Sequence, residues 1–301
     1  MSKDSVVVNF HGDDVKPSPP EQAFFHVIPV PFEKSVTYGT GTAKGPRAIL
    51  EASCQLELLT CGNIPADQGI YTAPEIDCLA STEEVLKHIE KAVSSVLEHG
   101  AVPVVLGGEH TVTCGVIPAL QKYYNNFGVI QFDAHADLRD VYEGSDFNHA
   151  CVMRRIHEKN IPIFQIGTRS YSLEEQDYRN NHNIPNIDSE EIWRKGTDLR
   201  LPPDFPDHVY ITFDIDALDS SLLPATGTPV PGGLNWYQAM WMIEQIMESR
   251  VCIGFDVVEL APQESLHASS FAAAQLTYNL MGYFCKSGTN REHWFDKAFQ
   301  R

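Results

Sequence analysis

Apolar and polar residues alternate along the chain in two recurring patterns. Short apolar runs bounded by glycine, proline or polar residues are typical of buried strands. We expect such strands at 24–31, 102–106, 127–132, 161–167, 184–187, 208–213 and 251–255. Between them, apolar residues recur at helical spacing, and we expect helices at 81–100, 110–124, 149–159, 173–182, 188–194, 235–248 and 269–284, with another that begins at Gly45.

This alternation of strands and helices predicts an α/β fold, with a mostly parallel sheet covered by helices on both faces. No linker, composition shift or repeat divides the chain, so we expect a single domain at residues 21–301. Residues 1–20 are polar and proline-rich, and we expect them to form an N-terminal arm.

The composition argues against several classes of protein. The formal net charge of −18 and the lack of a Lys or Arg run argue against nucleic-acid binding. No segment approaches the roughly 18 uninterrupted apolar residues of a membrane span. The seven cysteines include no Cys-x-x-Cys pair, and the N-terminus has no apolar signal segment. We therefore expect a cytoplasmic protein with reduced cysteines.

Polar side chains follow four of the predicted strands, at the point where each apolar run stops. In open α/β sheets, ligands bind outside the carboxyl ends of the strands, so we expect these side chains to meet at one edge. They are His110 after one strand, Asp133, His135 and Asp137 after another, Asp214 and Asp216 after a third, and Asp256 and Glu259 after a fourth.

Six of these residues have the side chains of metal ligands. Taken singly, each has an ordinary structural explanation, such as a polar turn, a capping histidine or a solvated carboxylate. Together, four buried carboxylates would repel one another strongly without cations. Two imidazoles and four carboxylates exceed the needs of one ion and suit two bridged ions. An oxygen-rich set without cysteine favours Mn²⁺, with nickel or zinc as alternatives. The six are His110, Asp133, His135, Asp137, Asp214 and Asp216.

The motifs that carry these residues resemble those of the ureohydrolase family of arginases and agmatinases. Gly107–His110, Phe132–Asp137 and Thr212–Asp216 match three family blocks in order and spacing, and Asp256–Pro262 matches a fourth. The resemblance covers residues 24–285 and implies a three-layer α/β/α sandwich with about eight strands. Small departures occur where many members have other residues: Glu109 replaces Asp, Thr111 replaces Ser, and Ser220 replaces Pro or Ala.

The resemblance implies two manganese ions per subunit, bridged by Asp133 and Asp214. The other ligands would divide between the ions, His110 with Asp137 on one and His135 with Asp216 on the other. It also implies that a hydroxide bridging the ions attacks the carbon of a guanidinium group and releases urea.

Three catalytic roles follow from the same resemblance. Asp137 would hold or relay the proton of the attacking water. Glu259 would pair with the substrate guanidinium through a charge-assisted contact. His149 matches the family's proton-shuttle histidine, which protonates the leaving amine. The alternative for His149 is an ordinary surface histidine at the start of a helix.

The loop at 138–148 bears on the choice of substrate. It lacks the Ser-Gly-Asn pattern of arginases and carries three acids, Asp140, Glu143 and Asp146. Acidic side chains would attract the amine tail of a substrate, and in this the loop resembles that of agmatinases. Arg139 is the one residue that argues against an amine tail. We predict hydrolysis of agmatine to putrescine and urea, a step of polyamine biosynthesis, by a homotrimer or homohexamer.

Several alternatives to agmatine stay open. N1-aminopropylagmatine is a close rival, and 4-guanidinobutyrate is another if Arg139 faces the pocket. A formimino-group hydrolase and a non-catalytic metal-binding member of the family are less favoured, because the loop is acidic and every ligand, His149 and Glu259 are present.

Overall fold

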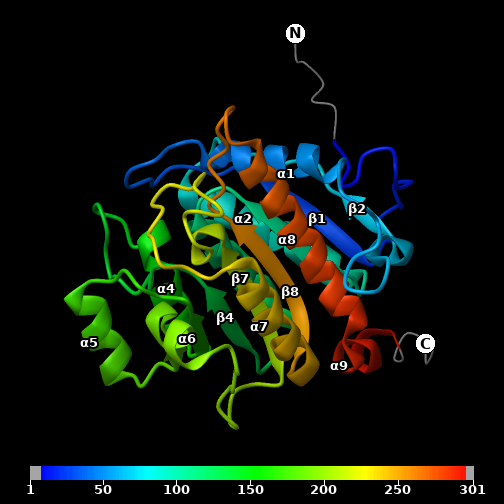
Figure 1. The fold of residues 1–301 in the computed structure, drawn as a ribbon. Coiled ribbons are helices and arrows are strands. Elements are labelled where there is room, and N and C mark those ends of the chain that lie inside the picture. The colour runs from blue at the N-terminus through cyan, green and yellow to red at the C-terminus, as the bar shows by residue number, and fades with distance from the viewer. Residues whose placement is uncertain (1–7, 296–301) are drawn as a thin grey trace.

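Eight parallel strands form one sheet in the computed structural model, which describes residues 8–295 (Figure 1). The strand order across the sheet is β2-β1-β3-β8-β7-β4-β5-β6. The strands are β1 (Phe25–Val30), β2 (Ile70–Thr72), β3 (Val102–Gly107), β4 (Gly128–Phe132), β5 (Ile163–Ile166), β6 (Asn186–Ile187), β7 (His208–Asp214) and β8 (Val251–Val258).

Helices cover both faces of this sheet. One apolar core joins it to α1 (Gly45–Ser53), α6 (Ser189–Lys195), α7 (Trp236–Ser249) and α8 (His267–Lys286). A second core joins the other face to α2 (Thr82–Glu98), α3 (Thr113–Tyr123) and α4 (Val152–His157). The chain also forms α5 (Leu173–Asn181) and α9 (Gly288–Asn290). The predicted three-layer α/β/α sandwich is confirmed.

Short helical turns complete the framework. The 3-10 turns are η1 (Thr42–Lys44), η2 (Pro65–Gln68), η3 (His110–Val112), η4 (His149–Cys151) and η5 (Ile215–Ala217), and one π-helical turn spans Arg291–Phe295. Turns η3 and η4 each lead directly into a helix. Both therefore place a histidine at the start of a helical segment.

Every predicted strand and helix is present, with ends that shift by at most three residues. Capping boxes at Ser81, Ser172 and Asn235 fix where α2, α5 and α7 begin. Strand β2 was not predicted, because three residues are too few to show a periodicity.

Part of the expected N-terminal arm packs into the domain. The side chains of Phe10 and His11 are buried, and the His11 ring meets the edge of Tyr278. The backbone N–H of Phe10 donates to Thr72 Oγ1, and that of His11 to Ser53 Oγ, each at 2.9 Å. Packing thus begins before residue 21, while the arm's residues 1–7 lie outside the described part. Within residues 8–295, no helix is long and apolar enough to cross a membrane.

The sheet order explains how the polar strand ends meet. Strands β3, β8, β7 and β4 are consecutive neighbours, and all run parallel. These are the four strands that end in the predicted site residues. Their carboxyl ends therefore lie side by side along the C-terminal edge of the sheet, near its centre.

Candidate metal centre and active site

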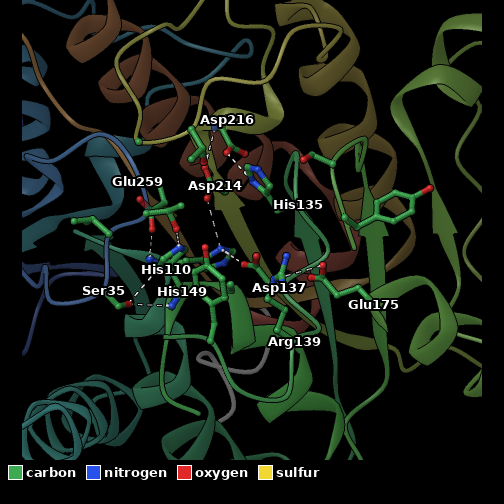
Figure 2. Close-up of a pocket in the computed structure, with 18 of the residues that line it drawn as sticks. Ser35, His110, His135, Asp137, Arg139, His149, Glu175, Asp214, Asp216 and Glu259 are labelled. Carbon is green, nitrogen blue, oxygen red and sulfur yellow. Dashed lines mark hydrogen bonds and ion pairs between the residues drawn. The ribbon is translucent and has the colours of Figure 1, made fainter. Parts of the chain in front are cut away.

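Two triads of ligand-type side chains lie at this edge and share Asp133. One triad is His110, Asp133 and Asp137, and the other is Asp133, His135 and Asp216. Within each triad, the ligand atoms lie within 4.8 Å of one another. Asp214 Oδ2 lies 3.6 Å from His110 Nδ1, so the sixth predicted ligand borders the same space (Figure 2).

Backbone hydrogen bonds orient the carboxylates. Asp133 Oδ1 accepts from the N–H of His135 at 2.6 Å, and Asp216 Oδ1 from the N–H of Ala134 at 2.9 Å. Asp214 Oδ1 accepts from the N–H of Asp216 at 2.8 Å. One oxygen of each carboxylate is held by the backbone, and carboxylate oxygens of the cluster lie 3.0–3.6 Å from Nδ1 of His110 and His135.

A chain of hydroxyl contacts selects the tautomer of His110. Thr212 Oγ1 donates to Asp256 Oδ1 at 2.7 Å and lies 2.8 Å from His110 Nε2. Because its only hydrogen goes to Asp256, Thr212 must accept from Nε2–H. His110 Nδ1 then carries the lone pair. Metal-binding histidines commonly use their second nitrogen in this way.

The surroundings of His110 Nδ1 fit a bound cation. The atom is buried and has no hydrogen-bond partner among the described residues. Carboxylate oxygens of Asp137, Asp133 and Asp214 nevertheless lie 3.0, 3.2 and 3.6 Å away. A buried lone pair facing three carboxylates is unfavourable without a positive charge between them.

The pKa values record the same repulsion. Burial, and then the charge of Asp133, raises the pKa of Asp137 to about 7. Burial, and then the charges of Asp216 and Asp133, raises the pKa of Asp214 well above its ordinary value. Burial opposes ionisation of His135, but the carboxylates of Asp216 and Asp133 raise its pKa to about 12. Divalent cations would relieve this repulsion.

A cavity of about 300 Å³ opens above the ligand cluster. Glu259 and His149 line it together with five of the six ligands. Glu259 Oε1 accepts from the N–H of His110 at 2.6 Å, and burial raises the pKa of Glu259 to about 8. His149 begins η4, where the Asn148 side chain caps the turn by accepting from Ala150 N–H at 3.0 Å.

The far side of the cavity carries one acidic and one basic side chain. Figure 2 shows Arg139 and Glu175 on one side and Ser35, His149 and Glu259 on the other. Arg139 Nε lies 3.8 Å from Glu175 Oε2, and its guanidinium lies over a tyrosine ring, that of Tyr142, at 4.9 Å. The condition set for 4-guanidinobutyrate, an Arg139 that faces the pocket, is therefore met, although Glu175 offsets its charge.

The acids of the 138–148 loop do not line the cavity. Asp140 Oδ1 pairs with Arg155 Nη2 at 2.7 Å, and Asp146 Oδ2 lies 3.8 Å from Arg155 Nη1. Glu143 is exposed at a left-handed turn with φ of 51°. The idea that these three acids attract a substrate amine is wrong, because α4 supplies the arginine that two of them contact.

Comparison with known proteins decides the family. The profile of the Arginase family matches residues 23–282. The chain belongs to the arginase family. It is a ureohydrolase, an enzyme that acts on the C–N bonds of guanidino groups.

Three relatives illustrate the likeness of this arginase-family chain to known proteins. It is 37% identical to an N(1)-aminopropylagmatine ureohydrolase of Synechocystis sp., over 87% of this chain and 89% of that one. It is 32% identical to an agmatinase of Pyrococcus horikoshii, over 87% of this chain and 92% of that one. The crystal structure of an agmatine ureohydrolase of Thermoplasma volcanium superposes on this chain with a TM-score of 0.84 at 29% sequence identity. The match covers 93% of this chain and 96% of that one.

Sequence patterns missed several residues of this ureohydrolase site. Thr212 is a polar position inside an apolar strand, and Asp256, expected directly after the fourth strand, lies inside β8; their contact depends on the register of β7 and β8. Glu175 is a cavity acid that also occupies the capping box of α5, so its sequence pattern indicates only the cap. Ser35 carries no signal of its own, whereas Thr37 lies in the loop at 36–42, whose two glycines and small polar residues are typical of a ligand-contacting segment.

Proposed function

We propose that this ureohydrolase hydrolyses a linear guanidinoalkylamine to urea and an amine. The observation that carries the proposal is the position of Asp133 in two ligand triads beneath one cavity. That cavity also holds Glu259 and His149, a carboxylate for a guanidinium and an imidazole for a leaving amine.

The six clustered side chains would hold two divalent ions, and Asp133 belongs to both triads. Two imidazoles and four carboxylates are donors that suit Mn²⁺. When bound, such ions lower the pKa of a water molecule so that hydroxide is available at neutral pH. The predicted homotrimer or homohexamer stays a prediction.

The residues of the chain then divide the remaining work. Glu259 would orient the guanidinium by a charge-assisted contact, and the cation would in turn favour the ionised carboxyl group. Asp137 would hold the proton released by the attacking water. His149 would give a proton to the leaving amine.

Glu175 supports an amine at the tail of the substrate. Apart from the metal-type ligands and Glu259, it is the acid that lines the cavity. Its oxygens accept from the N–H of Leu138 at 3.1 Å and from Ser172 at 2.8 Å, so both carboxylate oxygens act as acceptors. Arg139 offsets part of this charge, so the tail site discriminates less sharply than a lone acid would.

The names of the relatives support N1-aminopropylagmatine ahead of agmatine. Four relatives at 33–37% identity bear the name N(1)-aminopropylagmatine ureohydrolase, whereas two agmatinases are 32% identical. We therefore place N1-aminopropylagmatine first and agmatine, the substrate predicted from sequence, second.

The test is urea release by the Mn²⁺-loaded enzyme from four compounds: N1-aminopropylagmatine, agmatine, 4-guanidinobutyrate and arginine. We expect kcat/KM for the better amine to exceed that for either carboxylate by at least ~10-fold, which corresponds to about 1.4 kcal/mol. Faster turnover of arginine or 4-guanidinobutyrate would contradict the proposal. Ammonia in place of urea would indicate a formimino-group hydrolase.

A further inference from the structure

The loop that follows β1 is anchored on the buried carboxylate of Glu109. Glu109 Oε2 accepts from the backbone N–H groups of Lys34 and Ser35, the latter at 2.6 Å. Glu109 Oε1 accepts from Ser35 Oγ at 2.7 Å and from Thr111 Oγ1 at 2.6 Å. Four donors on a side chain that is 1% exposed fix the position of Ser35.

Ser35 in turn contacts His149 twice. Its Oγ atom accepts from the backbone N–H of His149 at 3.2 Å and lies 3.2 Å from His149 Nδ1. A serine hydroxyl has one hydrogen to donate and two lone pairs. Because that hydrogen goes to Glu109, the contact with Nδ1 requires the hydrogen to be on the ring. Neutral His149 therefore carries its proton on Nδ1.

The other ring nitrogen faces Thr37. His149 Nε2 lies 2.8 Å from Thr37 Oγ1, and both residues line the cavity. In the neutral ring, Nε2 holds the lone pair and accepts from the threonine hydroxyl. In the protonated ring, Nε2–H can donate to the same oxygen, since a hydroxyl serves in either role. The contact thus persists in both protonation states of the ring.

We propose that Glu109, acting through Ser35, fixes His149 in its Nδ1-protonated tautomer, so that Nε2 takes up the proton and passes it to Thr37 Oγ1, whose own hydroxyl hydrogen goes to the leaving amine. The inference rests on the proposed function and adds two positioning residues to it, with Thr37 as the partner that holds the reacting nitrogen. Burial lowers the pKa of His149, which favours the neutral ring in which the choice of tautomer matters.

The kinetic test removes the hydroxyl of Ser35 and leaves Glu109 unchanged, because Glu109 lies next to the predicted metal ligand His110. Ser35→Ala should lower kcat on the order of 10- to 100-fold, a fraction of what general acid–base catalysis supplies, with KM within about twofold. Ser35→Thr should restore most of the loss. Ser94→Ala on α2, a matched control outside the cavity lining, should leave kcat unchanged.

A double-mutant cycle separates this role from a general structural one. If Ser35 acts through His149, Ser35→Ala should change kcat by less than about twofold in a His149→Ala background. The same loss in both backgrounds, or no loss in the wild-type background, would overturn the inference.

The tautomer can be read without any substrate. In enzyme labelled with ¹⁵N-histidine and loaded with diamagnetic Zn²⁺, the His149 signals, assigned with His149→Ala, should show a protonated Nδ1 and an unprotonated Nε2. In Ser35→Ala this preference should weaken. The opposite tautomer in the wild-type enzyme would refute the inference. If no guanidino compound releases urea, the proposed function fails, while these signals still decide the tautomer.

Discussion

His110 Nε2 lies 2.8 Å from Thr212 Oγ1, and this contact turns the lone pair of Nδ1 toward three carboxylates. Thr212→Val keeps the shape of the side chain but removes the acceptor. We expect the affinity for one of two Mn²⁺ ions to fall roughly 10- to 100-fold, as for other partners of ligating histidines. Isothermal titration of the metal-free protein measures it, and Thr212→Ser should preserve the affinity.

Thr113→Val is the matched control for this prediction. Thr113 Oγ1 also donates to Asp256, at 2.9 Å, whereas the hydroxyl that contacts the His110 ring is that of Thr212. Both valine variants should lose stability, because each leaves Asp256 with one donor fewer. Only Thr212→Val should weaken metal binding, and equal metal affinities in the two variants would refute the role given to Thr212.

The metal-free protein should lose stability as the pH rises from 7 to 8.5. The folded pKa values of Glu259, about 8, and His135, about 12, exceed their ordinary values of 4.5 and 6.5. The folded chain therefore binds more protons than the unfolded chain in this window, so a rise in pH shifts the equilibrium toward the unfolded chain. The pKa of Asp133 is lowered instead, so it is ionised in both states and adds no slope.

Calorimetry of the metal-free protein should show Tm falling on the order of 5 °C across this window. Saturating Mn²⁺ should flatten the dependence, because the ions replace the protons of the cluster. Glu259→Gln should reduce the slope in the metal-free protein. A metal-free Tm that rises between pH 7 and 8.5 would show that the ligand cluster is not electrostatically strained.

Substitution of Arg139 tests how the tail of the substrate is recognised. Arg139→Met keeps an apolar contact with Tyr142 but frees Glu175 of a positive neighbour 3.8 Å away. We expect KM for agmatine and N1-aminopropylagmatine to fall severalfold and activity on 4-guanidinobutyrate to drop, measured as urea release. Arg200→Met, on an exposed side chain, is the control. A loss confined to the amine substrates would place the tail elsewhere.

The clustering of the ligand-type side chains was predictable from sequence because it follows local rules. Asp133, His135 and Asp137 alternate after a buried strand, and parallel strands bring Asp214 and His110 to the same edge. The order of the central strands was not predicted, but the rule that ligands bind at the carboxyl ends was enough to group these residues.

The partners of these ligands were not predictable, since they depend on pairing between distant segments. Thr212 meets Asp256 because β7 and β8 pair in that register across 44 positions. Asp140 and Asp146 looked like substrate contacts, but Arg155 pairs with both. Loop acids give no local sign of which direction they face, whereas strand residues do.

The central claim is that Asp133 joins two metal ions in a centre that releases urea. Metal analysis of the purified enzyme, paired with urea release from agmatine and N1-aminopropylagmatine, tests it most directly. Asp140→Ala, which removes an exposed acid outside the cavity lining, is the matched control. The account predicts two Mn²⁺ per chain in the wild type and the control, and fewer than two with at least ~100-fold less urea release in Asp133→Ala. Undiminished urea release by Asp133→Ala would contradict it.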